Sequence, residues 1–146
     1  MVSALIFAGG IGQRMKSLDI PKQFLEIEGK PIIVRTMEHF SNHPMVDNIV
    51  VVCVENWLDV LNQDIEKFGI KKVIKTVPGG ATGYHSIHNG LLEVAKVASD
   101  DDIVLICDGV RPMLSEDLIT TCIEDAKKYE SAVPVTPSID SVLYSE

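Results

Sequence analysis

Residues 4–12 read ALIFAGGIG, an uninterrupted apolar run followed at once by three glycines in four positions. Five consecutive apolar side chains without alternation are typical of a strand that is buried on both faces, as in a parallel sheet covered by helices. Glycine lets the backbone that follows turn sharply and approach a ligand without hindrance from a Cβ atom. The stretch therefore predicts a buried strand that leads into a functional loop.

Similar apolar runs recur along the chain, at residues 49–54, 72–77, 103–107 and 132–135. Between them lie segments with helical periodicity, at residues 31–40, 57–68, 84–97 and 115–129. Pro31 suits a first helical turn, and Ser115 suits an N-cap because Glu116 and Asp117 follow it. The alternation predicts an α/β, Rossmann-like fold with a mostly parallel sheet and helices on both faces.

The size and composition of the chain are those of one ordinary domain. It has 146 residues, of which 46% are hydrophobic, so we expect a single domain over residues 1–146. The three cysteines, Cys53, Cys107 and Cys122, are odd in number and widely spaced. This pattern favours buried, reduced thiols over a disulfide framework or a zinc site.

The charge balance argues against some partners. A formal net charge of −8 disfavours nucleic acid and anionic membranes, whereas a local cluster of cations and N–H groups still suits a small anionic ligand. No apolar run approaches the roughly 20 residues that span a bilayer, and the first residues lack the basic segment of a secretory signal. We therefore expect a cytoplasmic protein that binds neither nucleic acid nor membranes.

The glycine loop and two cations after it form the first candidate site. Ligands of open α/β sheets bind beyond the carboxyl ends of the strands, and consecutive N–H groups of residues 9–12 can point at a phosphate. Arg14 and Lys22 add two positive charges nearby. The alternative is a plain turn with surface charges. The loop is neither a P-loop, since Gly-Lys-Ser/Thr is missing, nor a dinucleotide fingerprint, since Met15 stands where Gly or Ala is needed.

Residues 8–15 and 21–25 read AGGIGQRM and PKQFL. They resemble the signature of the cytidylyltransferase family that includes methylerythritol-phosphate and ribitol-5-phosphate cytidylyltransferases. The resemblance implies that the loop wraps the phosphates of CTP, and that Arg14 and Lys22 are catalytic cations at the triphosphate. It also implies a set of nucleotide-binding loop residues, namely Ala8, Gly9, Gly10 and Gly12.

A second loop, residues 78–91, reads PGGATGYHSIHNGL and is similar to a glycine-rich stretch of the same family. The resemblance implies a cytosine pocket lined by Gly80, Ala81, Thr82 and Ser86. Many relatives have Arg where Gly83 stands, which puts any role of that side chain in doubt here. The alternative for Ser86 is a helix cap or surface hydroxyl. His85 and His88 are expected to be surface histidines, because no acidic or cysteine ligand completes a metal pair.

Asp108 follows the apolar run of residues 103–107. A carboxylate at the tip of a buried strand suits Mg²⁺, although Asp also commonly caps turns. The segment DGVRP, residues 108–112, resembles the family pattern Asp-x-(Ala/Val)-Arg-Pro. The resemblance implies that Asp108 binds magnesium and that Arg111 shapes the acceptor pocket, the alternative for Arg111 being a salt bridge that anchors the loop.

Residues 135–142, VTPSIDSV, resemble the Pro-Val-x-Asp-Thr stretch of the family. The resemblance implies that Asp140 and Ser141 border the acceptor phosphate. The alternative is a β-turn built on Pro137 and Ser138.

Together these features predict a Mg²⁺-dependent cytidylyltransferase that joins CTP to ribitol 5-phosphate or 2-C-methyl-D-erythritol 4-phosphate. The alternatives are a non-catalytic nucleotide-binding module and a sugar-nucleotide transferase that uses another NTP. The resemblance covers only about the first two thirds of a typical family member, whose later segments complete the acceptor site and pair two subunits. We therefore expect a homodimer for the full-length protein, and weak or absent turnover for this chain alone.

Overall fold

The structure is a computed structural model, which describes residues 1–9 and 20–137. Its elements in chain order are β1 (Val2–Ala8), η1 (Lys22–Phe24), β2 (Glu26–Ile27), β3 (Lys30–Pro31), α1 (Ile32–Asn42), β4 (Asn48–Cys53), η2 (Glu55–Trp57), α2 (Leu58–Lys67), β5 (Val73–Pro78), α3 (Gly83–Val94), β6 (Ile103–Asp108) and α4 (Glu116–Tyr129). The strands expected near residues 4–8, 49–54, 72–77 and 103–107 are therefore confirmed.

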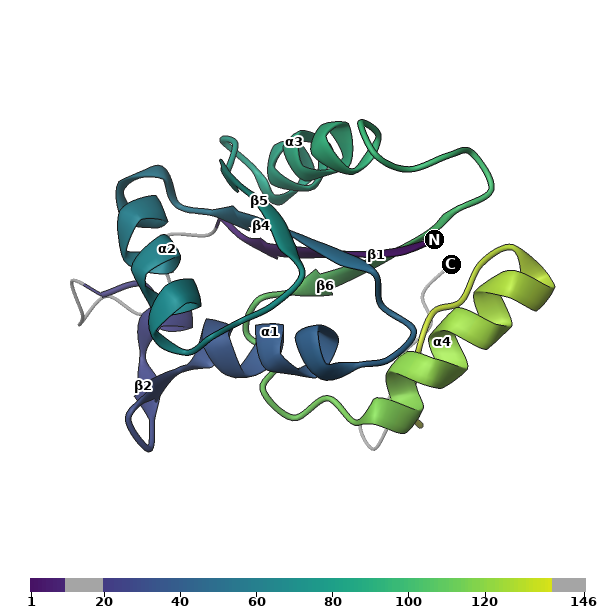
Figure 1. Ribbon diagram of the computed structural model, residues 1–146, viewed down its shortest axis with the longest axis horizontal. Coiled ribbons are helices and arrows are strands. Elements are labelled where there is room, and N and C mark those ends of the chain that lie inside the picture. Colours follow the sequence, from purple (N-terminus) through teal and green to yellow (C-terminus); the bar gives the residue numbers. More distant parts are fainter. Residues whose placement is uncertain (10–19, 138–146) are drawn as a thin grey trace, which may run out of the picture.

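Four parallel strands form the main sheet, in the order β5-β4-β1-β6 (Figure 1). The chain moves outward from β1 to β4 and β5, and then crosses to the other side of β1 to form β6. The order of the strands thus reverses between β1 and β6. Open α/β sheets bind ligands at such a reversal, just outside the carboxyl ends of the strands.

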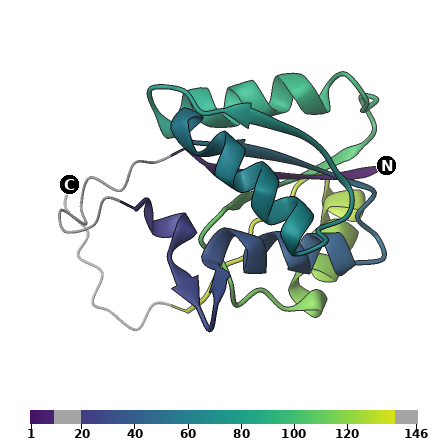
Figure 2. The ribbon, with the colours of Figure 1, turned by 60° about the vertical axis from the view of Figure 1, so that its left-hand side comes forward.

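Helices cover both faces of this sheet, as the sequence predicted (Figures 1 and 2). On one face α1, α2 and α4 pack over a core that includes Ile6, Met37, Leu61 and Ile119. On the other face α3 is the one helix among the described residues, and it packs over a smaller cluster that includes Leu5. Leu5 and Ile6 are both fully buried although they point to opposite faces, which explains why all residues of β1 except Ser3 are apolar.

Close approach of α3 to the sheet depends on Gly90. A Cβ atom built at this position would lie 2.2 Å from Leu5 Cδ1 and 2.7 Å from Val52 Cγ2. The helix backbone therefore rests on the side chains of β1 and β4, which fixes the height of α3 above the sheet.

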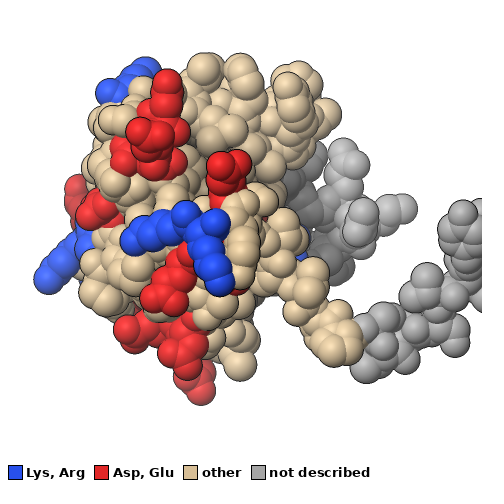
Figure 3. Space-filling model, turned by 90° about the vertical axis from the view of Figure 1, so that its right-hand side faces the viewer, with Lys and Arg blue, Asp and Glu red and all other residues tan. Residues whose placement is uncertain are grey.

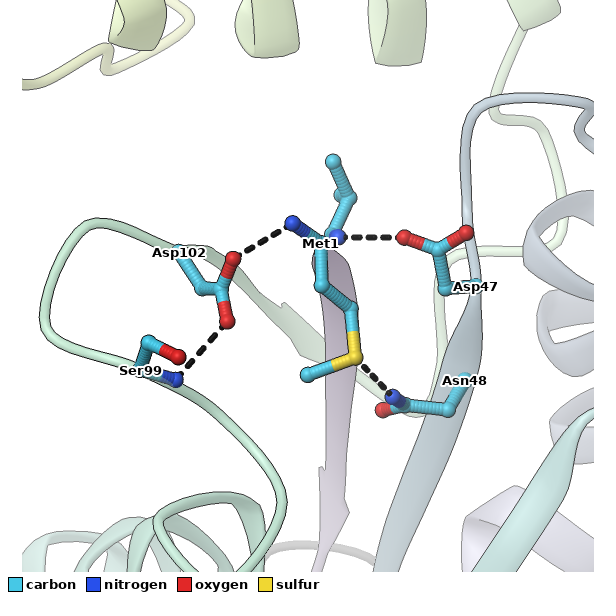
Figure 4. Close-up of polar contacts among 6 residues, drawn as sticks. Met1, Asp47, Asn48, Ser99 and Asp102 are labelled. Carbon is cyan, nitrogen blue, oxygen red and sulfur yellow. Dashed lines mark hydrogen bonds and ion pairs between the residues drawn. The ribbon is translucent and has the colours of Figure 1, made fainter.

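The amino end of β1 is held by polar contacts to the segments that precede β4 and β6 (Figure 4). The ammonium group of Met1 forms an ion pair with Asp102, and the N–H of Ser99 donates to the same carboxylate at 2.8 Å. The N–H of Val2 donates to Asp47 at 2.7 Å. Hydrogen bonds from the terminal ammonium and from Ser99 lower the pKa of Asp102. These contacts lie at the opposite end of β1 from the glycine loop.

The prediction of a strand at residues 132–135 is wrong. Residues 131–137 have no regular secondary structure, and Val133 and Val135 are 81% and 90% exposed. A groove of about 780 Å³ lies beside β6 and α4 and is bordered by Ala132 and Pro134. Pro134 interrupts the apolar run and offers no N–H for a strand ladder, which accounts for the difference.

Helix ends differ slightly from the predicted ones. Pro31 precedes the first turn of α1 instead of lying in it, and η2 forms a separate turn before α2. The helical periodicity of residues 57–68 does give one apolar face, since Trp57, Leu58, Leu61, Ile65 and Phe68 all pack in or against the core. Ser115 is the N-cap of α4, where its Oγ accepts from the N–H of Leu118 at 3.2 Å.

All three cysteines are free thiols, as expected, although Cys107 and Cys122 are only partly buried. Burial raises the pKa of Cys53 to about 12. Burial, and next the charge of Asp108, raise the pKa of Cys107 to about 11. These thiols are therefore protonated near neutral pH and carry little nucleophilic reactivity.

The described surface carries mixed charge. On the face shown in Figure 3, basic side chains lie in small groups among acidic ones, so the described residues form no continuous basic surface there. Among the helices that the structure describes, none combines the length and apolar character of a membrane span.

Candidate functional site

Two glycine-containing loops meet at the carboxyl ends of the strands. A Cβ atom built at Gly9 would lie 3.3 Å from Gly79 Cα, and one built at Gly79 would lie 3.0 Å from Gly9 Cα. The N–H of Gly79 also donates to the carbonyl of Cys53 at 2.7 Å. The loops that follow β1 and β5 therefore pack backbone against backbone across the end of β4, at a distance that glycine permits and larger residues do not.

Ser86 joins these two loops. Its side chain is buried, with an exposed fraction of 2%, and its Oγ lies where a Cβ of Gly9 would need space. The same Oγ accepts from the N–H of Gly80 at 3.0 Å and donates to the carbonyl of Thr82 at 3.1 Å. Ser86 is therefore neither a surface hydroxyl nor the helix cap, because it holds the loop from inside.

Thr82 is the N-cap of α3, and its side chain contacts His85. Thr82 Oγ1 accepts from the N–H of His85 at 3.3 Å and lies 2.8 Å from Nδ1 of the same residue. A Cβ atom built at Gly80 would lie 2.3 Å from His85 Cβ. His85 is exposed, as predicted, yet it is packed against the loop residues that were assigned to the base pocket, and Ala81 is exposed beside them.

Lys22 is placed near the end of β1 by its neighbour Gln23. The Nε2 of Gln23 donates to the carbonyl of Ala8 at 2.7 Å, and its side chain is buried. Phe24 packs against Trp57 with 4.7 Å between the ring centroids. These contacts anchor η1 beside the glycine loop. Lys22 is half-buried and forms no ion pair with any other described residue.

Asp108 ends β6 directly beside β1, where it is paired with Phe7. The N–H of Gly109 donates to the carbonyl of Phe7 at 2.9 Å, and a Cβ at Gly109 would lie 2.8 Å from Ala8 Cβ. One carboxylate oxygen of Asp108 accepts from the N–H of Val110 at 3.2 Å. Asp108 thus caps a turn, as the alternative reading proposed, and it stands at the strand reversal where a ligand is expected.

Arg111 lies on a loop that is tied to α1. Thr36 Oγ1 accepts from the N–H of Arg111 at 3.1 Å. The same hydroxyl lies 3.1 Å from each of two carbonyl oxygens, those of Gly109 and Ile32, to which it can donate. His39 Nε2 lies 2.9 Å from the carbonyl oxygen of Pro112. No salt bridge joins Arg111 to a residue within 1–9 or 20–137, so its loop is anchored by Thr36 and not by an ion pair.

Most of the predicted residues that the structure describes lie together. Ala8, Gly9, Gly80, Ser86 and Asp108 surround the carboxyl end of β1, with Lys22 close by, whereas the contacts of Arg111 are to α1. Five further predicted residues lie outside the described part of the chain: Gly10, Gly12, Arg14, Asp140 and Ser141.

Sequence reasoning missed three residues that shape this site. Gln23 lies inside the quoted PKQFL segment, and a polar amide between apolar residues was a usable signal. His85 follows Thr82 by three residues, the spacing at which an N3 side chain reaches a cap. Thr36 gave no signal, because a buried threonine in an amphipathic helix looks like any other core position.

Comparisons with known proteins agree on one relationship. A family model described as IspD, 2-C-methyl-D-erythritol 4-phosphate cytidylyltransferase, matches residues 2–146. A ribitol-5-phosphate cytidylyltransferase of Streptococcus agalactiae serotype Ia is 47% identical over 139 residues, which cover 95% of this chain and 58% of that protein. A 2-C-methyl-D-erythritol 4-phosphate cytidylyltransferase of Clostridium botulinum strain Loch Maree is 43% identical over 130 residues, covering 89% and 55%.

Solved structures support the same relationship. The 4-diphosphocytidyl-2C-methyl-D-erythritol synthase of Anaerococcus prevotii superimposes with a TM-score of 0.68 at 29% identity. The superposition covers 87% of this chain and 51% of that one. The chain thus spans between half and three fifths of the length of these relatives.

Proposed function

Because the chain belongs to the 2-C-methyl-D-erythritol 4-phosphate cytidylyltransferase family, we propose that it serves to transfer CMP from CTP to a sugar-alcohol phosphate, with release of pyrophosphate. The observation that carries the proposal is the packing of Gly9 against Gly79 beside Asp108 and η1. Two close-packed glycine turns lie at the strand reversal, where a nucleotide can approach their backbone without hindrance from Cβ atoms, and one cation and one carboxylate lie next to them.

The proposed transfer reaction explains why the site needs cations. Attack of an anionic phosphate on the α-phosphorus of CTP brings two negative groups together, and charge builds on the equatorial oxygens and on the departing pyrophosphate. Lys22, and Arg14 in the preceding loop, would stabilise this charge more in the transition state than in the ground state. Gly80, Ala81, Thr82 and Ser86 would hold the cytosine, which is small enough for backbone and hydroxyl contacts to identify it.

Magnesium is proposed at Asp108. The described residues contain no cluster of three or more His, Cys, Asp or Glu side chains that could hold a metal ion. Mg²⁺ nevertheless fits a single carboxylate, because it takes its other ligands from substrate phosphates and water. When bound, the ion would neutralise charge on the triphosphate oxygens. Asp108 stands where such a triphosphate would lie, at the end of β1.

We propose ribitol 5-phosphate as the acceptor and 2-C-methyl-D-erythritol 4-phosphate as the second candidate. The ribitol-5-phosphate cytidylyltransferase cited above is slightly more identical to this chain than the 2-C-methyl-D-erythritol 4-phosphate cytidylyltransferase, at 47% against 43%. Arg111, Asp140 and Ser141 are the residues assigned to the acceptor. A cytoplasmic location agrees with the use of CTP, and the homodimer remains a prediction for the longer protein.

Nucleotide binding and pyrophosphate release test the proposal. We expect the chain to bind CTP more tightly than UTP, ATP or GTP, and only with Mg²⁺, in calorimetric titrations. The longest natural product of the gene should release pyrophosphate from CTP with one of the two alditol phosphates, and this chain alone should do so weakly. Equal affinity for all four nucleotides, or no release with either acceptor, would contradict the proposal.

A further inference from the structure

The hydroxyl of Thr82 is held by a histidine that the proposed function does not use. Thr82 Oγ1 accepts from the N–H of His85 at 3.3 Å and lies 2.8 Å from His85 Nδ1. Both residues are exposed at the loop that is proposed to receive the base. The side chain of His85 is packed against Gly80, where a Cβ atom would lie 2.3 Å from His85 Cβ. The backbone and Cβ of His85 therefore lie tightly against the loop at Gly80.

The donors and acceptors of this pair can be counted. A threonine hydroxyl has one proton and two lone pairs, and a neutral imidazole has one N–H and one lone pair. One lone pair of Thr82 Oγ1 takes the N–H of His85. Where Nδ1 carries the imidazole lone pair, it accepts the hydroxyl proton, and Thr82 then keeps a single free lone pair for a ligand.

The position of the pair favours this tautomer. Thr82 and His85 stand at the first turn of the 12-residue helix α3, whose N–H groups concentrate partial positive charge there. A lone pair on Nδ1 is stabilised by that charge, whereas an N–H in its place is not. The ring of Tyr84 lies edge-on to the ring of His85, with 5.6 Å between the ring centroids. Tyr84 itself stacks on His88, with 6.3 Å between the centroids.

Within the described part of the chain, no charged side chain competes with Thr82 for the imidazole nitrogens, because no ion pair or hydrogen bond joins His85 to one. The Thr82 hydroxyl is thus its one side-chain hydrogen-bond partner there.

We propose that His85 is a positioning residue for base selection, which fixes the Thr82 hydroxyl so that only a lone pair faces the pocket. Such a lone pair accepts from the exocyclic amino group of cytosine and meets the carbonyl oxygen of uracil without a hydrogen bond. The inference rests on the proposed function, because it takes Thr82 as part of the cytosine pocket. It adds the group that distinguishes two pyrimidines of the same shape.

Matched substitutions test the inference through the ratio of the Kd values for UTP and CTP. His85→Phe removes the acceptor and frees the hydroxyl to donate, so the preference for CTP should fall about five- to tenfold. His85→Asn keeps an acceptor near the place of Nδ1 and should retain most of the preference. His88→Phe makes the same change one turn later on α3, away from Thr82, and should leave the ratio unaltered. An unaltered ratio in His85→Phe would overturn the inference.

The outcome separates the two proposals. If the unaltered chain prefers CTP and His85→Phe does too, the role of His85 fails while the proposed function stands. If the unaltered chain binds neither CTP nor UTP, the proposed function fails and the role of His85 fails with it. Nitrogen NMR of the ring provides a readout without any variant: Nδ1 should be unprotonated and Nε2 protonated, and the opposite tautomer would refute the assignment.

Discussion

Ser86 Oγ occupies the space beside Gly9 that a side chain would need, because a Cβ at Gly9 would lie only 2.5 Å from it. The two residues lie far apart in the sequence, Ser86 in α3 and Gly9 in the loop after β1. Ser86 cannot easily turn away, since its Oγ also bonds Gly80 and Thr82. This contact couples the proposed phosphate loop to the proposed base loop.

Gly9→Ala should therefore disturb both loops. We expect a loss of about 1–3 kcal/mol in the free energy of unfolding, as for other overpacked sites, together with weaker CTP binding. Urea unfolding of Gly9→Ala, Ser86→Ala and the double variant measures the coupling. Because Ser86→Ala removes the clashing oxygen, the double variant should lose less than the sum of the single losses. Strictly additive losses would show that the two side chains do not compete for space.

Thr36 should control the loop that carries Asp108 and Arg111. Thr36→Val keeps the shape of the side chain but removes the hydroxyl that contacts the N–H of Arg111 and the carbonyl of Gly109. We expect a loss of about 1–3 kcal/mol in the free energy of unfolding, because these backbone groups lose their partner. Thr36→Ser keeps the hydroxyl and serves as the control. A Thr36→Val variant as stable as Thr36→Ser would contradict the assignment.

Gly90 should be intolerant of a side chain, unlike Gly83 in the same helix. Gly90→Ala forces a methyl group against Leu5 and Val52 and should cost about 1–3 kcal/mol in urea unfolding. Gly83 has no atom within 4 Å of its built Cβ. Gly83→Ala should therefore be neutral or stabilise the protein by about 0.4–1 kcal/mol, by restricting the unfolded chain. Equal effects of the two substitutions would count against the packing described for α3.

Substitution of Lys22 or Asp108 should lower the rate of turnover far more than it destabilises the fold. In the longest natural gene product, Lys22→Met and Asp108→Asn should each lower kcat for pyrophosphate release by about 10²–10³-fold, since each removes charge that acts on the transition state. Lys71→Met and Asp101→Asn, at exposed positions outside the site, are the matched controls. Turnover that survives either site substitution within a factor of two would remove that residue from the proposed mechanism.

The free energy of unfolding should depend on pH through Asp102. Its pKa is lower in the folded protein than the value of about 3.9 for an unfolded chain, because the terminal ammonium and the N–H of Ser99 bond its carboxylate. The stabilisation is therefore complete above pH of about 4 and is lost as the pH falls through the folded pKa. The gap in urea midpoint between the unaltered chain and Asp102→Asn should be constant at pH 5–6 and close in stronger acid. A gap that persists unchanged at pH 2 would disprove this role.

The local part of the fold was readable from residue patterns. Apolar runs such as residues 4–8 predicted strands because a strand buried on both faces tolerates few polar side chains. Ser115 predicted the start of α4 because a cap is a contact between near neighbours. The pattern failed at residues 132–135, since apolar residues form a strand only where a neighbouring edge accepts their hydrogen bonds.

By itself, the sequence determined which segments form strands and helices, where the glycine loops lie and which family the chain resembles, because these depend on residues close together along the chain. Only the tertiary structure decided that Gly9 meets Gly79 and Ser86, that Gln23 holds η1 against Ala8, and that Thr36 anchors the loop of Arg111. These contacts join residues brought together by the strand order, and the strand order is set by the packing of the whole sheet and its helices.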